Sequence, residues 1–275
     1  MASYLSSAAE VKKFLDKPNM QEQNGVMFAY ATDPKVLAKL VPAPLEPVAP
    51  VVAGYVTYMG KPTFAKPYYE AVLYALVKFG KIVGAYPFSL LLSGEGAEEA
   101  MIAGRDGAGM PKKLADKIVF EQAEQKIHAE IVRHGVKLLD LNWQAGQPND
   151  AAVAQKIMGA AAGKPGEPAD TASFFINYDL NQNKDGSNSF VNTELVATLS
   201  KAITTKMVPG ALDLKLASSP DDPFGELVVA KPIGAAWYQV KSSVMYQTLH
   251  LQKLDPAQAA PYLITGNYDR AMLNE

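Results

Sequence analysis

Hydrophobic and polar residues alternate in the first third of this chain in short runs that predict strands. Val51 to Tyr58, Tyr69 to Phe79 and Ile82 to Leu92 are rich in β-branched and aromatic residues and are separated by Gly and Pro. Runs of this kind are typical of β-strands. Gly80-Lys81, between the second and third runs, predicts a hairpin turn. We therefore expect an antiparallel meander in this part of the chain.

The same pattern returns in the middle of the chain and near its end. Lys117 to Phe120, Lys126 to Val132 and Val136 to Trp143 are further runs joined by polar or Gly-containing turns. The segment from Ala235 to Leu254 predicts a long strand pair or one bent strand. Most of the expected sheet is therefore antiparallel.

Apolar residues at the three- and four-residue intervals of a helix occur only in shorter segments. Asp33 and Pro34 are suited to the cap and first turn of a helix that runs to Leu40. Strands in runs, with helices on one side, predict an α+β fold built on a mainly antiparallel sheet that closes into a barrel, with peripheral helices. The other predicted helices are Ser7 to Leu15, Glu95 to Ile102, Asp150 to Ala162 and Thr193 to Thr204.

The composition is that of an ordinary globular protein. The chain has 275 residues, of which 48% are hydrophobic and 20% are charged, with a formal net charge of −2. Since no linker rich in Pro, Gly and Ser divides it, we expect a single domain over residues 1–275. Acids and bases alternate along most segments, which argues against a nucleic-acid partner.

The chain has no cysteine, which excludes a disulfide scaffold, a thiolate metal site and cysteine catalysis. Residues 1–17 lack an apolar run of signal-peptide length, and the longer apolar runs elsewhere fall short of about 18 residues. We therefore expect no membrane partner and a cytoplasmic protein.

Two patterns resemble metal sites without meeting their requirements. His128 and His134 share one side of a predicted strand but lie too far apart to chelate one ion. In the polar run 179–186, a calcium loop that begins at Asn181 would have Asn192 at its twelfth position, where a bidentate Glu is needed. We therefore expect no metal, and a hairpin turn near Gly186.

The sequence GRDGAGMPKKLA, Gly104 to Ala115, places two adjacent lysines in a loop with apolar neighbours. Pro111 fixes its own φ, and the glycines permit turns that other residues resist. Burial beside a second cation, Lys113, can lower the pKa of Lys112 from about 10.4 by roughly 3 to 5 units. A neutral Lys112 would be a nucleophile. The alternative is a solvated pair of lysines in a turn.

This segment resembles the signature of the acetoacetate decarboxylase family, which has a Pro-Lys-Lys-Leu-Ala run after a Gly-Arg-acid element. Phe28 to Asp33 and Leu40 to Glu46 are similar to the family's early strand and its Pro-x-Pro-Leu turn, and Tyr68-Tyr69-Glu70 resembles its Tyr-x-Glu segment. The likeness covers the first half of the chain well and the second half loosely. It implies a barrel-like or cone-like sheet around the lysine.

The resemblance also implies roles for particular residues. The first lysine of the pair, Lys112, would form a Schiff base with a ketone, and Lys113 would modulate it. Glu70 would shuttle protons, with a salt bridge to Lys112 or Arg105 as the alternative. The covalent imine serves as the electron sink, so we expect no cofactor. A homo-oligomer acting on a small oxo acid is implied.

Departures from the family affect the choice of reaction. No arginine precedes Arg105, Tyr55 lies where a second glutamate is expected, and Met110 replaces an aromatic residue. These differences favour an aldolase-dehydratase that joins pyruvate to an aldehyde over a decarboxylase of acetoacetate or another 3-oxo acid. A catalytically silent ligand-binding protein is the alternative outside enzyme chemistry.

The remaining site residues are predicted from position and side-chain type. Tyr246, with Tyr238 as the alternative, is the candidate for assisting dehydration. Residues expected to line the substrate pocket are Arg105, Met110, Tyr55 and Tyr69.

Overall fold

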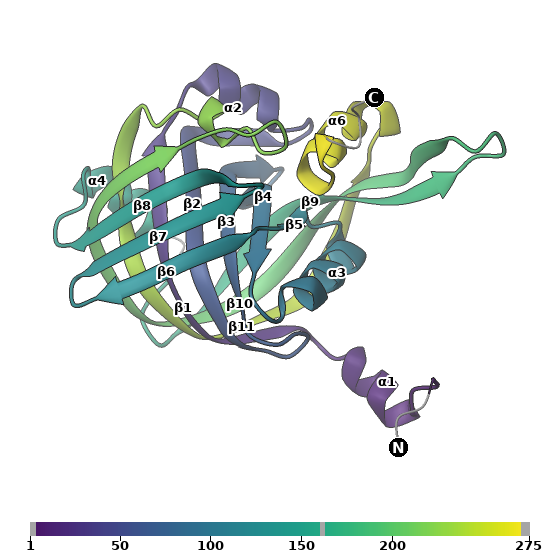
Figure 1. Cartoon of the computed structure of the whole chain (residues 1–275), viewed down its shortest axis with the longest axis horizontal. Coiled ribbons are helices and arrows are strands. Elements are labelled where there is room, and N and C mark those ends of the chain that lie inside the picture. Colours follow the sequence, from purple (N-terminus) through teal and green to yellow (C-terminus); the bar gives the residue numbers. More distant parts are fainter. Residues whose placement is uncertain (1–3, 160–162, 271–275) are drawn as a thin grey trace.

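The computed structural model describes residues 4–159 and 163–270 as one large curved sheet with helices around it (Figure 1). Its helical elements are α1 (Ala8–Phe14), α2 (Pro34–Leu40), α3 (Ala97–Ala108), α4 (Ala151–Ala154), the π-helical turn η1 (Gln155–Gly159), the 3₁₀ turn η2 (Phe224–Glu226) and α6 (Pro256–Asn267). Its strands are β1 (Asn19–Ala31), β2 (Glu46–Pro62), β3 (Tyr68–Phe79), β4 (Ile82–Ser93), β5 (Lys112–Leu114), β6 (Lys117–Ala123), β7 (Lys126–Arg133), β8 (Val136–Ala145), β9 (Pro168–Gln182), β10 (Asn188–Leu216) and β11 (Lys231–Lys253).

The strands follow one another in the order β11-β1-β2-β3-β4-β9-β10-β8-β7-β6, and β11 also pairs with β10. This extra pairing makes β11, β1, β2, β3, β4, β9 and β10 a ring of paired strands. The ring is the part of the expected barrel or cone that the pairings support. The strands β8, β7 and β6 continue from β10 as a layer that lies over the ring (Figure 1).

Much of the expected sheet is confirmed. The three runs of the first third of the chain are β2, β3 and β4, and the runs between Lys117 and Trp143 are β6, β7 and β8. These neighbours pair antiparallel. The sheet is nevertheless mixed, because β4 pairs in parallel with β5 and β9.

Some predictions about helices were wrong. Thr193 to Thr204 is part of the long strand β10, since its β-branched side chains pair with β9 and β11. The helix predicted to end at Ile102 continues to Ala108 and takes in Gly104. Of the helix expected from Asp150 to Ala162, α4 and η1 form the described part, and residues 160–162 lie outside the described residues. The C-terminal helix α6 was missed.

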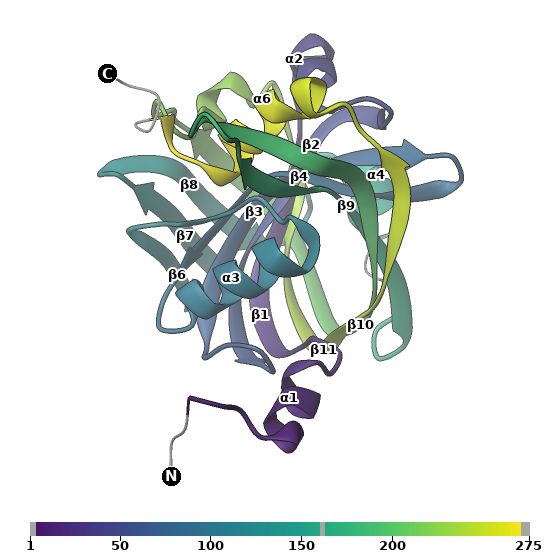
Figure 2. The same cartoon turned by 90° about the vertical axis from the view of Figure 1, so that its right-hand side faces the viewer.

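The alternation of side chains on β3 separates two faces of the ring. Ala71 and Leu73 pack into the main hydrophobic core with the residues of β6 to β8. Glu70 and Val72 point to the opposite face, where Val72 packs with Leu90 of β4. The helix α3 packs against β4, β5 and β9 and lies across the curved sheet (Figure 2). The candidate site lies on this face.

No helix among the described residues combines the length and apolar character needed to cross a membrane.

Candidate active site

The lysine pair lies on β5, directly after a helix that ends at a glycine. Gly109 follows α3 with a φ of 66°, in the left-handed region, and its amide donates to the Arg105 carbonyl. A Cβ there would lie 2.4 Å from the Ile176 carbonyl oxygen, so glycine is required for both conformation and space. Pro111 then leads into β5, whose Lys112 pairs in register with Leu90.

The two lysines of β5 project to opposite faces, as successive residues of a strand do. Both are buried, with 4% of each residue exposed. Lys112 points to the face that carries Glu70. Lys113 points to the other side and meets Asp222. The solvated turn considered from the sequence is therefore wrong. Lys113 was expected to place a second positive charge beside the Lys112 ammonium. That expectation is also wrong, because Lys113 faces the other side of the strand.

Lys112, Glu70 and Tyr55 form the centre of the site. The Lys112 Nζ lies 3.3 Å from Glu70 Oε2 and donates to the Ala100 carbonyl oxygen at 3.3 Å. The Tyr55 hydroxyl donates to Glu70 Oε1 at 2.7 Å. Burial, followed by the charge of Glu70, raises the pKa of Tyr55 well above its ordinary value, so its hydroxyl keeps its proton at neutral pH. The carboxylate is thus held between an ammonium and a phenol.

The alternation along β2 and β3 explains why these side chains meet. Tyr55 pairs with Val72 and Thr57 with Glu70 in the antiparallel register, so all four point to one face. From β11, which β1 separates from β2, the Tyr238 hydroxyl forms a hydrogen bond with Thr57 Oγ1. Tyr238, the alternative to Tyr246, therefore adjoins the site.

The surroundings of the pair are apolar. Met110 is half-buried against the cluster beside Tyr55. Charges in such surroundings are costly unless paired, which is the condition that Lys112 and Glu70 meet. The cluster consists of Val72, Leu90, Ala108, Phe175 and Val196, with Tyr55, Tyr74 and Met110 against it.

Arg105 has a role different from the one expected. Its Nε donates to the Lys112 carbonyl oxygen at 2.8 Å, and its Nη2 donates to the Asn267 carbonyl oxygen of α6. Its guanidinium lies 5.9 Å from the centre of the Tyr268 ring. The side chain therefore joins β5 to the end of α6 and holds the backbone of the lysine.

Lys113 belongs to a buried ionic cluster. Its Nζ lies 3.2 Å from Asp222 Oδ1, and Asp222 Oδ2 accepts from Arg133 at 2.5 Å. Arg133 also donates to both oxygens of Asp269, at 2.6 and 2.8 Å. Burial lowers the pKa of Lys113, against the opposing effect of Asp222. No local pattern predicted this cluster, because its members come from β5, β7 and two late segments.

Two predicted residues lie elsewhere. Tyr69 points to the main-core face of β3, opposite Glu70, and its ring lies 5.1 Å from that of Tyr58. Tyr246 is 40% exposed and contacts Asp170 and Lys201 at the surface. The period of two on a strand explains the first error: Tyr68, not Tyr69, shares a face with Glu70.

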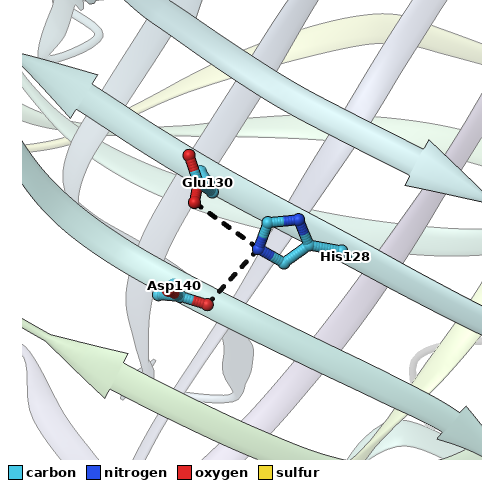
Figure 3. A group of neighbouring side chains, drawn as sticks. All are labelled: His128, Glu130 and Asp140. Atoms are coloured by element: carbon cyan, nitrogen blue, oxygen red, sulfur yellow. Dashed lines mark ion pairs between the residues drawn. The ribbon is translucent and has the colours of Figure 1, made fainter.

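Among the described residues, one group of possible metal ligands combines His128 with Glu130 and Asp140 on β7 and β8 (Figure 3). The His128 Nε2 lies 3.6 Å from Glu130 Oε1 and 3.4 Å from Asp140 Oδ1. Lys137 pairs with both carboxylates, so an internal cation already offsets part of their charge. We interpret the group as a surface ion-pair cluster.

Comparison with known proteins gives matches over almost the whole chain. The family model described as acetoacetate decarboxylase matches residues 3–254. A curated protein of Lactiplantibacillus plantarum named "CLA biosynthesis isomerase" is 50% identical over 275 residues, which is 100% of this chain and 97% of that protein.

Solved structures match at lower identity. The acetoacetate decarboxylase of Legionella pneumophila is 18% identical with a TM-score of 0.74, covering 92% of this chain and 98% of that one. The enduracididine biosynthesis enzyme MppR, complexed with the condensation product of pyruvate and imidazole 4-carboxaldehyde, is 13% identical with a TM-score of 0.67, covering 87% of this chain and 91% of that one. These likenesses show a shared fold.

Proposed function

Because this chain belongs to the acetoacetate decarboxylase family, we propose that Lys112 forms an imine with a ketone and that Glu70 moves protons next to it. The observation that carries the proposal is the buried pair of Lys112 Nζ and Glu70 Oε2 at 3.3 Å. A proton passed from the ammonium to the carboxylate would give a neutral, nucleophilic amine in apolar surroundings. No cofactor is needed for this step.

The reaction we propose is the migration of a double bond in an unsaturated ketone. The amine of Lys112 adds to the carbonyl, water leaves, and an iminium forms. Glu70 removes a proton from the carbon between the iminium and the double bond, which gives a dienamine. Return of the proton at the far end of the dienamine leaves the double bond conjugated to the iminium. Water then hydrolyses the iminium and releases the conjugated ketone and the free amine.

Three observations favour isomerisation over loss of CO2. A relative that is 50% identical over the whole chain is named a CLA biosynthesis isomerase. Isomerisation needs only a shuttled proton, whereas decarboxylation needs the substrate carboxylate to be held. Arg105 is occupied by the carbonyls of Lys112 and Asn267. The apolar lining around Tyr55 and Met110 suits an aliphatic chain.

The experiment uses an unsaturated ketone whose double bond lies one carbon away from conjugation. Conversion should appear as the ultraviolet absorbance of a conjugated enone, and reduction with borohydride should leave an adduct on Lys112. Conversion that proceeds at the wild-type rate in Lys112→Met would contradict the imine. Absence of both conversion and adduct, with ketone binding retained, would support the catalytically silent alternative.

A second candidate is the aldolase-dehydratase reaction. It is favoured by the MppR complex, which holds a condensation product of pyruvate and an aldehyde on the same fold. Pyruvate would form an enamine on Lys112 in the same way. This enamine would attack an aldehyde, and the adduct would then lose water. Purified protein given pyruvate and an aromatic aldehyde would then form a conjugated product faster than it releases CO2 from acetoacetate. Rapid CO2 release without condensation would favour a decarboxylase.

The proposed reaction needs a small carbonyl compound, such as an oxo acid, as the ligand. From the sequence we also expect a homo-oligomer in the cytoplasm.

A further inference from the structure

Tyr68 is a buried residue near Lys112 and is not among the groups that carry out the steps proposed above. It lies on β3 two residues before Glu70, so the two side chains leave the strand on the same face. Tyr68 is 1% exposed. The Lys112 Nζ lies 6.0 Å from the centre of its ring. The ring therefore forms part of the wall beside the reactive amine.

The hydroxyl of Tyr68 has no hydrogen-bond partner among the described residues. A buried phenol normally finds a partner, because leaving a polar group unpaired away from water costs free energy. Tyr55, its neighbour in the site, has such a partner in Glu70. The structure thus keeps one donor of the site paired with the carboxylate and leaves the other unpaired.

The hydroxyl of Tyr68 remains protonated at neutral pH. Burial, followed by the charge of Glu70, raises its pKa well above its ordinary value. A protonated phenol can donate a hydrogen bond to an oxygen. The site has two carboxylate oxygens, which are already engaged by Lys112 and Tyr55. An oxygen brought by a ligand is the acceptor that this arrangement lacks.

We propose that Tyr68 binds the carbonyl oxygen of the substrate and donates a proton to it while Lys112 forms the imine. This assignment rests on the proposed function, because it names the group that assists the first step of that reaction. As the Lys112 nitrogen bonds to the carbonyl carbon, the C=O double bond becomes a C–O single bond and the oxygen takes up the hydroxylic proton of Tyr68. The oxygen leaves as water after a second proton arrives from the amine through Glu70, and the phenolate regains its proton from solvent or from Glu70.

The same hydroxyl defines a binding subsite for a carbonyl group. The ligand class is a ketone or an oxo acid whose carbonyl oxygen faces Tyr68 and whose carbonyl carbon faces Lys112. Donors placed at a developing oxyanion are worth about 10²- to 10³-fold in rate when they are preorganised in a water-excluded site.

The test is Tyr68→Phe, which removes one oxygen atom and keeps the ring. Tyr30→Phe is the matched control, because Tyr30 is also fully buried with an unpartnered hydroxyl but lies in the main core. The rate of borohydride-trapped adduct formation with pyruvate, and the turnover of the unsaturated ketone, should fall about 10²-fold in Tyr68→Phe and remain at the wild-type level in Tyr30→Phe. Equal rates in the two variants would overturn the assignment.

A second measurement separates this assignment from the proposed function. In Lys112→Met no imine can form, so a bound ketone keeps its carbonyl group, and a hydrogen bond from Tyr68 would lower the C=O stretching frequency in the infrared difference spectrum. The shift should be present in Lys112→Met and lost in Lys112→Met with Tyr68→Phe. An unshifted frequency in Lys112→Met would overturn the role of Tyr68, even where wild-type protein forms the adduct. A wild-type protein that forms no adduct would refute the imine, and the infrared shift would still decide whether Tyr68 binds the carbonyl.

Discussion

Gly104 of α3 lies directly against the side chain of Lys112. A Cβ at position 104 would be 2.7 Å from Cδ, 2.8 Å from Cε and 3.1 Å from Nζ of the lysine. The helix can therefore approach the Lys112 amine only because position 104 lacks a side chain. The glycine is needed here for space, since it lies inside the helix.

The first prediction concerns this contact. Gly104→Ala should displace the Lys112 amine and lower the rate of borohydride trapping by about 10²-fold, because small misplacements of a reacting group are costly. Gly107→Ala is the control, since a Cβ at position 107 of the same helix meets nothing within 4 Å. It should gain about 0.5 to 1 kcal/mol of stability. Equal trapping rates in both variants would show that the Gly104 contact does not position the lysine.

The second prediction separates the two lysines. Lys112→Met should abolish the trapped adduct. Lys113→Met should leave an adduct on Lys112, formed more slowly, but lower the free energy of unfolding by about 3 kcal/mol or more, because it removes one partner of a buried ion pair. Urea titration measures the stability and mass spectrometry locates the adduct. An adduct on Lys113 in the wild-type protein would reverse these roles.

The third prediction concerns the proton shuttle. Glu70→Gln retains the size of the side chain and one of its two acceptor oxygens but cannot take up a proton, so turnover should fall by roughly 10²- to 10⁴-fold. Trapping should be partly preserved, since Lys112 remains in place. When the reaction runs in deuterated water, deuterium should enter the carbon at the far end of the dienamine. Its rate of uptake should fall in Glu70→Gln by the same factor as turnover. Turnover at the wild-type level would make Glu70 a structural ion-pair partner only.

The fourth prediction concerns stability in acid. Burial alone would raise the pKa of Asp269, but hydrogen bonds from Arg133 and His134 outweigh it and hold the pKa below its ordinary value. Its stabilising contribution should therefore be complete above the unfolded-state pKa of about 3.9, and be lost as the pH falls from there through the lower folded-state pKa.

Asp269→Asn tests this prediction when urea unfolding is followed against pH. The variant should be less stable at pH 7 and should lose less stability than the wild-type protein as the pH falls below about 4. Asp213→Asn, which removes an exposed carboxylate, is the control. Parallel pH profiles for Asp269→Asn and the wild-type protein would contradict the assignment.

The sequence predicted the strands and the central pair of the site because both depend on local patterns. Alternation in β2 and β3 is visible in the chain, and the family signature singles out Lys112 and Glu70. The hydrogen bond of Tyr55 to Glu70 was not predicted, although the register that brings them together follows from two neighbouring strands. Both residues were named, but with separate roles.

The predictions that were wrong concern contacts between residues that lie far apart in the sequence. Thr193 to Thr204 has the length of a helix, and only its pairing with β9 and β11 makes it a strand. Arg105 was expected to line the substrate pocket, but α6, about 160 residues later, supplies the Asn267 carbonyl that it binds. Tyr246 was preferred to Tyr238, although Tyr238 is the one that adjoins the site, because the choice depends on which part of the long strand β11 passes Thr57.

The short strand β5 carries a lysine on each of its two faces, so its register against β4 decides which lysine meets Glu70. A shift of one position would bring Lys113 to the place of Lys112 and Leu114 to the place of Lys113. Glu70 would still meet an ammonium, but the buried Asp222 would lose its own. Three bonds to the backbone also hold the observed register: the Leu90 amide donates to the Pro111 carbonyl, the Ala115 amide donates to that of Leu92, and Arg105 donates to that of Lys112. The distant Asp222 thus helps to decide which of two adjacent amines lies beside Glu70.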